Sequence, residues 1–268
     1  METIRKTPAR AALALWLACA LTLVCAAGRA QSAFKSGEVL QYSLYYNWKF
    51  IWVKAGSATM NIARTNYCDT PIYRTQLLMR GSKRADSYFV LRDTLVSYTA
   101  CDDLRPMFYC KKDLEGDSYR SRKVWYTYSD GKCRVRQRYR HKDGRTTEKN
   151  EAFDSQVYDM LSIMLRARNY NTAGWKPGKR IRFLMTDGNG AERQTLIYRG
   201  KEKVKMKGTD NAYSCLKLSF VETTDKGKEK EVITFFVTDD SRHIPVRLDM
   251  YLKFGSAKAF FVSGKGLK

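Results

Sequence analysis

Hydrophobic residues recur at every second position along much of this chain. From Leu40 to Trp48, apolar or aromatic side chains alternate with polar residues such as Gln41 and Ser43. Similar alternation returns within residues 57–62, 233–237 and 246–253. This pattern puts apolar side chains on one face of a pleated strand and polar ones on the other, as in antiparallel sheets with one buried face. The chain is therefore predicted to be all-β and mainly antiparallel.

Turn-forming residues separate these stretches at spacings that suit a meander. They fall at residues 69–71, 102–103, 115–117, 129–131, 187–190 and 225–227. We therefore expect a single curved sheet or partly open β-barrel of about 12–14 strands.

The period of the pattern changes once, between residues 154 and 169. Apolar residues fall there at helical spacing, at Val157, Leu161, Met164 and Leu165. Asp154 stands where a helix N-cap is expected. The sequence thus predicts one central helix over residues 154–169.

The dipeptide Asp130-Gly131 is typical of a two-residue hairpin turn. Counting outward from that turn places Trp125 opposite Arg136 and Lys123 opposite Arg138. The second strand then carries four arginines on one face, at Arg134, Arg136, Arg138 and Arg140. We expect these residues to form an exposed basic stripe beside Trp125.

The first thirty residues have the composition of a secretory signal peptide, with a basic start, an apolar run and the small residues Gly28 and Ala30 at the expected cleavage positions. The apolar run covers only residues 11–24, which is shorter than the roughly 17–25 residues of a membrane-spanning helix. We expect cleavage after Ala30, leaving a single β-rich domain over residues 31–268. The expected location is the periplasm, with a secreted or outer-membrane-associated protein as the alternative.

The chain has 49 Lys and Arg against 27 Asp and Glu, a formal net charge of +22. Four of these basic residues and one acidic residue lie in the expected signal, so an excess of 19 positive charges remains. Such an excess favours anionic neighbours. For an exported protein, the expected partners are anionic lipid, lipopolysaccharide or acidic glycan rather than nucleic acid. Such partners would allow peripheral contact with a membrane. A merely solvated basic surface is the alternative.

The arginine stripe is our candidate anion-contacting site, together with Trp125. Alternate residues of a strand stand about 6.6–6.8 Å apart, and guanidinium groups bind phosphate through paired donors. We expect no acidic residue to be interleaved with the four arginines on that face, so that they repel one another until anions bind. Replacing all four by glutamine is therefore expected to weaken binding to anionic lipid vesicles, unless the stripe is only a solvated face.

Five cysteines follow the expected cleavage site, at Cys68, Cys101, Cys110, Cys133 and Cys215. The count is odd, so at least one thiol stays free in an oxidising compartment. In a meander, the turns near Cys68 and Cys101 are separated by one hairpin and lie at the same end of the sheet. This predicts a disulfide between Cys68 and Cys101.

The sequence shows no recognisable catalytic apparatus, and we predict no cofactor and no metal site. Its two histidines, His141 and His243, stand beside charged or turn residues rather than in a catalytic or zinc motif. The stretch 238–243 is predicted to be a turn before Pro245. Carboxylates are plentiful, but no spacing singles out a catalytic pair.

Several stretches together resemble a bacterial exported family known as domain of unknown function 3108. They are Gly37 to Tyr42 with Ala55 to Ala58 near the start, Tyr158 to Ser162 in the centre, and Thr238 to Asp240, Ile244 to Val246 and Gly255 to Ala259 near the end. The resemblance spans nearly the whole mature chain. It implies an exported β-rich protein of bacteria with an outer membrane, and it implies no particular activity.

The leading functional hypothesis is a non-enzymatic cell-envelope protein that binds an amphiphilic or anionic ligand. The alternatives are a hydrolase acting on envelope glycans or lipids, and a structural or assembly partner. A cavity lined by aromatic residues would favour the binding protein, and a cleft with two facing carboxylates the hydrolase. A filled core with a flat patch would favour the assembly partner.

Overall fold

A computed structural model describes residues 32–268, except 49–50, 88–89, 208–209, 224–226 and 253–254. The expected signal peptide and its cleavage site lie outside these residues, as does part of the predicted turn at 225–227. Residues Ala33–Lys268 form one compact unit. None of the helices within the described ranges is long and apolar enough to cross a membrane.

This part of the chain folds into fifteen strands and two short helices. The first eight strands are β1 (Glu38–Trp48), β2 (Ile51–Tyr67), β3 (Thr70–Gly81), β4 (Leu91–Ala100), β5 (Pro106–Glu115), β6 (Ser118–Ser129), β7 (Lys132–Arg140) and β8 (Thr146–Phe153). The other seven are β9 (Val157–Tyr158), β10 (Arg180–Thr186), β11 (Ala191–Lys205), β12 (Ala212–Thr223), β13 (Glu229–Thr238), β14 (Pro245–Tyr251) and β15 (Ser256–Lys265). The helices are α2 (Lys83–Asp86) and α3 (Met160–Arg168).

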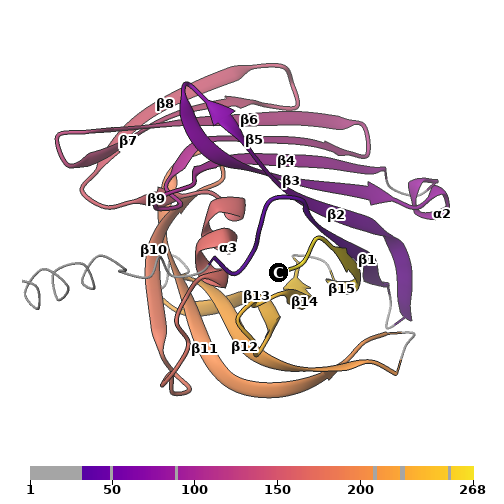
Figure 1. Cartoon of the computed structure of the whole chain (residues 1–268). Helices are drawn as coiled ribbons and strands as arrows, with labels where there is room; N and C mark the ends of the chain where they lie inside the picture. The colour runs from indigo at the N-terminus through magenta and orange to yellow at the C-terminus, as the bar shows by residue number, and fades with distance from the viewer. Residues whose placement is uncertain (1–31, 49–50, 88–89, 208–209, 224–226, 253–254) are drawn as a thin grey trace, which may run out of the picture. The chain divides into compact units, whose positions relative to one another are not determined.

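All fifteen strands belong to one sheet in the order β8-β7-β6-β5-β4-β3-β2-β1-β15-β14-β13-β12-β11-β10-β9. Neighbouring strands are antiparallel, except that β9 runs parallel to β10. Figure 1 shows the sheet curving around α3, which gives a nearly closed, barrel-like fold. The predicted fold class is confirmed. The strand count exceeds the expected 12–14 partly because β9 has two residues, too few to produce an alternating pattern.

The hairpin between β6 and β7 has the predicted register. Asp130 and Gly131 adopt φ values of 54° and 70°, as a two-residue type I′ turn requires. Trp125 pairs with Arg136, and Lys123 pairs with Arg138. The turn residues therefore specify which side chains share a face on these two strands.

The central helix is shorter than predicted, and its predicted N-cap was wrong. The carboxylate of Asp159 accepts hydrogen bonds from the backbone N–H groups of Leu161 and Ser162, each at 3.0 Å. The Ser162 hydroxyl accepts one in return from the Asp159 N–H at 2.9 Å, which completes a capping box. Val157 instead belongs to β9, and Asp154 is exposed and ion-paired with Lys132. The helix therefore starts at Met160 rather than near Asp154.

The helix α3 lies inside the curve of the sheet (Figure 1). Leu165 is fully buried in a cluster with residues of β1, β2 and β14, such as Leu40 and Val246. Leu161 joins a second buried cluster with residues of β4 to β7, such as Leu95 and Val124. The two leucines link these two clusters, so the interior around α3 is packed with side chains.

Side chains join the two edge regions of the sheet across the gap between β8 and β9. Gln137 of β7 accepts hydrogen bonds from the Thr186 hydroxyl and, at 2.9 Å, from the Gly190 backbone N–H. Gly188 has a φ of 101°, and a Cβ there would lie 2.7 Å from the Cβ of Arg122. The turn at 187–190 therefore needs a glycine to pack this closely against β6.

The turns that carry Cys68 and Cys101 lie at the same end of the sheet, as the predicted disulfide requires. Ala100 pairs with Ile72, and the Cys101 N–H donates to the Pro71 carbonyl at 3.0 Å. Both thiols are nevertheless free in this structure, as are those of Cys110, Cys133 and Cys215. The bridge stays a prediction.

Peptide mapping without reduction tests this pairing on protein recovered from an oxidising compartment. We expect a peptide that joins Cys68 to Cys101, while the buried Cys110, Cys133 and Cys215 remain thiols. Recovery of Cys68 and Cys101 both in alkylated form would contradict the prediction.

Candidate functional site

The four arginines of β7 all point to the outer surface of the sheet. Buried and exposed residues alternate along the strand, and the arginines occupy the exposed positions. The residues between them face inward, with Cys133, Val135 and Gln137 all buried. The strand thus presents the basic stripe that its sequence predicts.

Two of the four arginines have acidic partners, which corrects the expectation of a face without acids. The Arg138 Nε donates to a carboxylate oxygen of Glu148 at 2.6 Å, and Arg134 lies 3.4 Å from Asp130. Glu148 belongs to β8, where it stands directly opposite Arg138. The sequence of β7 alone does not reveal Glu148, because this acid comes from the neighbouring strand.

Arg136 and Arg140 form no ion pair with any residue of the described chain. The Arg136 guanidinium carbon lies 4.4 Å from the ring centroid of Trp125. The Arg140 guanidinium lies 5.8 Å from that of Tyr119. Both arginines are exposed, so the aromatic faces orient the cations and leave their N–H donors open to an anion.

Aromatic residues extend the site across the outer face toward β4. The ring centroid of Trp125 lies 5.9 Å from that of Phe108 on β5, which lies 5.3 Å from Tyr98 on β4. Phe108 pairs with Trp125, and Tyr98 pairs with Phe108, in the backbone register. The sequence does not predict this row, because only the pairing of β4, β5 and β6 brings the three rings together.

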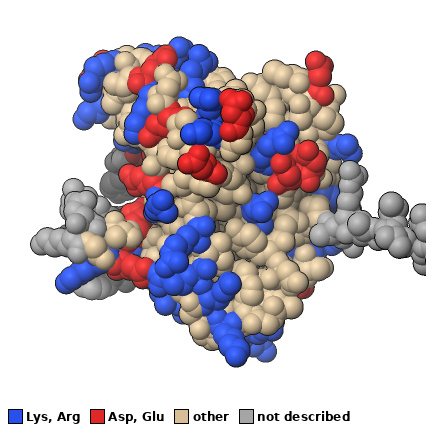
Figure 2. Space-filling model, turned by 90° about the vertical axis from the view of Figure 1, so that its left-hand side faces the viewer, with Lys and Arg blue, Asp and Glu red and all other residues tan. Residues whose placement is uncertain are grey.

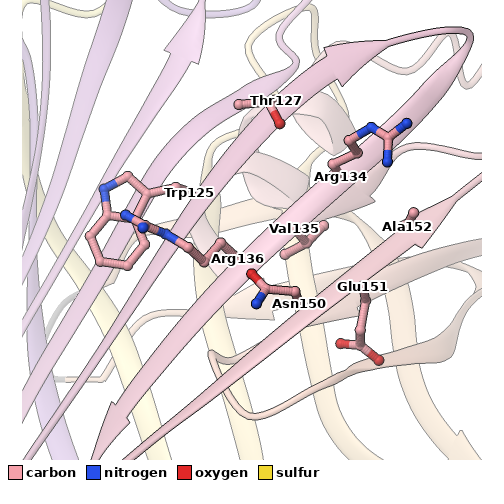
Figure 3. A pocket seen from close by; sticks show the side chains of 8 residues that line it. All are labelled: Trp125, Thr127, Arg134, Val135, Arg136, Asn150, Glu151 and Ala152. Atoms are coloured by element: carbon pink, nitrogen blue, oxygen red, sulfur yellow. The ribbon is translucent and has the colours of Figure 1, made fainter.

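A surface hollow of about 580 Å³ lies beside these residues on β6, β7 and β8. It is lined by Trp125, Thr127, Arg134, Val135, Arg136, Asn150, Glu151 and Ala152 (Figure 3). Glu151 points away from the two arginines in this view, and its carboxylate lies 2.8 Å from the Lys149 amine. Lys149 therefore neutralises Glu151 on the side of β8 that faces away from the two arginines.

The lining groups suit one class of ligand. The Arg136 guanidinium offers paired N–H donors for phosphate or carboxylate, and the Asn150 side chain adds a neutral amide. Arg134 lines the hollow too, but its guanidinium already donates to Ser129 and Asp130. Trp125 supplies an aromatic surface next to them, which suits an apolar or ring portion of the same molecule. The hollow can therefore hold an anionic group attached to a less polar body.

Two carboxylates face each other elsewhere in the protein, on the inner side of the sheet. Asp93 of β4 pairs with Asp113 of β5, and their exposed fractions are 5% and 0%. Asp113 accepts a hydrogen bond from Arg120 at 2.6 Å and lies 3.4 Å from Arg122. Burial raises the pKa of Asp93 to about 6, and the charges of Glu115 and Asp113 act in the same direction against that of Lys111. Both carboxylates are covered, so this arrangement is not a cleft that admits a substrate.

The two histidines occupy structural positions. His141 directly follows β7, with its Nε2 2.9 Å from the Thr147 hydroxyl. His243 lies buried in the turn before Pro245, and its Nδ1 donates to the Arg168 carbonyl at 2.7 Å. Among the residues that the structure describes, no group of three or more His, Cys, Asp or Glu is arranged to hold a metal ion.

The positive excess is spread unevenly over the surface. Figure 2 shows basic and acidic side chains interspersed in the upper half of one face, and basic residues gathered in the lower half. Net charge alone therefore does not identify a binding site. Local geometry distinguishes Arg136, whose charge has no acidic partner among the described residues, from Arg138, whose charge is paired with Glu148.

Comparison with known proteins agrees with this fold and assigns no activity. No curated protein matches the chain. Its fold is similar to the crystal structure of a β-barrel-like protein of domain of unknown function DUF1849 from Brucella abortus, with a TM-score of 0.57 and 12% sequence identity. The likeness covers 87% of this chain and 98% of that one, and at this identity it concerns the fold alone. The family model described as protein of unknown function (DUF3108) matches residues 41–262, and the chain belongs to that family.

Proposed function

We propose that this protein is an exported, non-enzymatic binding protein for an anionic amphiphile of the bacterial cell envelope. The hollow on β6, β7 and β8 is its binding site. The observation that carries the proposal is the placement of Arg136, which is exposed, lies over Trp125 and has no acidic partner among the described residues. Its guanidinium lines the same hollow as Arg134 and Asn150.

The physical argument rests on charge and desolvation. An arginine stacked on an aromatic ring is partly desolvated and already oriented, so an anion that reaches it loses less freedom than at a mobile side chain. The charge of the neighbouring Arg134 is partly balanced by Asp130, so Arg136 carries the anion contact, and Trp125 adds an apolar surface. A ligand with a phosphate or carboxylate beside an acyl chain or sugar ring satisfies both features.

The expected location supports the same ligand class. The N-terminal sequence predicts export, and the chain carries a formal charge of +22. Phospholipids, lipopolysaccharide and acidic glycans are the abundant anions of that compartment in bacteria with an outer membrane. We place the protein in the periplasm on this basis.

Titration with dihexanoyl phosphatidylglycerol, kept below the concentration at which it forms micelles, tests the site with a monomeric anionic amphiphile. The Arg136→Gln variant should bind it about tenfold or more weakly, because a charge-assisted hydrogen bond contributes about 1.5–3 kcal/mol. Arg138→Gln is the matched control, since Glu148 already neutralises that guanidinium. Its affinity should change by less than about threefold.

Two further probes identify the source of the anion. Dihexanoyl phosphatidylcholine should bind more weakly than the phosphatidylglycerol, and inorganic phosphate should bind more weakly still, because it lacks the acyl chains. Equal losses of affinity in Arg136→Gln and Arg138→Gln would contradict the proposal. They would indicate that the lipid is attracted by the overall positive charge of the protein rather than by one site. Equal affinity for the two lipids would contradict the claim that the ligand is anionic. An affinity for inorganic phosphate equal to that for the phosphatidylglycerol would contradict the claim that the ligand is an amphiphile.

A further inference from the structure

Exposed apolar side chains gather at the ends of two hairpins. Large hydrophobic residues are exposed at seven positions of the described chain, and four of these lie on either side of the β1–β2 and β14–β15 turns. They are Ile51, Val53, Tyr251 and Leu252, with exposed fractions between 46% and 65%. Single exposed hydrophobic residues are ordinary, but a group of them indicates an interaction surface.

The sheet makes these two hairpin ends neighbours. Tyr46 of β1 pairs with Val53 of β2 on one side and with Ala257 of β15 on the other. Ala257 in turn pairs with Met250 of β14, one residue before Tyr251. The four strands lie side by side in the order β2-β1-β15-β14. The four apolar residues therefore share one end of the sheet, which we call the apolar end.

Basic residues follow the apolar end along β2 and continue onto β3 and α2. Lys54 of β2, Arg80 of β3, and Lys83 and Arg84 of α2 are all exposed. The Ser82 backbone N–H donates to the Ala55 carbonyl at 2.8 Å, which holds the start of α2 against β2. None of the four side chains forms an ion pair with a residue in the described ranges, although the same structure pairs many other surface arginines and lysines.

This combination fits the surface of an anionic lipid bilayer. Aliphatic and aromatic side chains at a hairpin end reach the boundary between headgroups and acyl chains, and neighbouring basic groups meet lipid phosphates. A second copy of the chain fits less well, because the unpaired positive charges of two identical ends would repel each other. Exposure to water alone does not explain why four apolar side chains gather at one end of the sheet. It also does not explain why basic residues without acidic partners among the described residues lie near them.

We propose that the apolar end, with Lys54, Arg80, Lys83 and Arg84 beside it, docks this protein onto an anionic membrane. This surface is distinct from the hollow on β6, β7 and β8, because β4 and β5 lie between them in the sheet. The protein would thus hold its ligand at one place and contact the bilayer at another.

Flotation with vesicles tests the docking surface on the full mature chain. The double variant Ile51→Ser, Leu252→Ser should lower partitioning onto vesicles that contain phosphatidylglycerol by about tenfold or more. Val262→Ser is the matched control, because Val262 is 61% exposed near the other end of β15. That control should bind like the native protein. All substituted positions are exposed, and circular dichroism checks that each variant keeps its fold.

The basic residues are tested separately. Replacing Lys54, Arg80, Lys83 and Arg84 by glutamine should abolish the preference for phosphatidylglycerol over pure phosphatidylcholine vesicles. The matched control replaces Lys201 and Lys217, which are ion-paired with Asp239 and Glu202, and should keep the preference. Hydrogen exchange should also show vesicle-dependent protection of residues 51–54 and 251–252.

Three outcomes would overturn the docking proposal. The first is unchanged partitioning of the Ile51→Ser, Leu252→Ser variant, and the second is an equal loss in Val262→Ser. The third is protection of residues 51–54 that depends on protein concentration without lipid, which would indicate a second copy of the chain as the occupant.

Discussion

Replacing Glu38 by glutamine should lower the free energy of unfolding by about 3–5 kcal/mol, because Arg168 would then keep a buried charge without a counter-ion. The two side chains are 1% and 2% exposed. They form two hydrogen bonds, Arg168 Nη1 to Glu38 Oε1, and Nη2 to Oε2 at 3.1 Å. Arg168 also donates to the Arg242 carbonyl at 3.0 Å and to the Ala33 carbonyl at 3.3 Å. One guanidinium thus joins the end of α3, the start of β1 and the turn before β14.

Urea unfolding of the single variant and of Glu38→Gln, Arg168→Met tests this expectation. The double variant should be less destabilised than Glu38→Gln, since removing both partners leaves no unpaired buried charge. A loss below about 1 kcal/mol in Glu38→Gln would show that water reaches Arg168, and would contradict the burial on which the expectation rests.

Asp93 and Asp113 should respond in opposite ways to the same substitution. Asp113→Asn should lower the free energy of unfolding by about 2 kcal/mol at neutral pH, because Arg120 and Arg122 would lose their shared buried partner and keep only Glu115 and Asp187. Asp93→Asn should raise it at neutral pH, since the charged form of Asp93 is disfavoured by burial and by nearby acids. One oxygen of Asp93 also has no hydrogen-bond partner in the described structure.

The pH dependence has a definite sign. The folded-state pKa of Asp93 is about 6, above the ordinary unfolded value of about 3.9. The folded protein therefore binds the proton more tightly, so this contribution to stability is present below pH 4 and is lost as the pH rises through 6. A shift of this size corresponds to about 3 kcal/mol at most. Burial raises the pKa of the helix cap Asp159 to about 6 in the same sense.

Urea unfolding of native protein and Asp93→Asn between pH 4 and 8 measures this contribution. As the pH rises across that range, the native protein should lose stability relative to the variant. Asp159 is present in both proteins, so its contribution to the dependence of stability on pH should be similar in both. A stability difference between the two that is independent of pH would contradict the raised pKa of Asp93.

Local signals made the sheet predictable. The period-two pattern identified buried positions such as Leu40, Met60 and Val246, and Asp130-Gly131 specified the pairing of β6 with β7. The helix start was mistaken because Val157 fits a helical spacing as well as a strand. The capping residues Asp159 and Ser162 were visible in the sequence and are the signal that would have corrected it.

Contacts between distant segments were not predictable in this way. The arginine stripe was placed on the outer face, but Glu148 and the ring of Phe108 come from other strands. The ion pair of Glu38 with Arg168 joins residues 130 positions apart. No local pattern encodes such partners, because they depend on how the sheet curves around α3.

Mass spectrometry of molecules that copurify with the protein from the periplasm tests the proposed function most directly. The account predicts that native protein carries an amphiphile with a phosphate or carboxylate group. It also predicts that Arg136→Gln, purified in the same way, carries much less of it, and that Arg138→Gln carries as much as native protein. Copurification of a neutral molecule, or of the same anionic amphiphile in equal amount with Arg136→Gln, would contradict a site built on the unpaired guanidinium over Trp125.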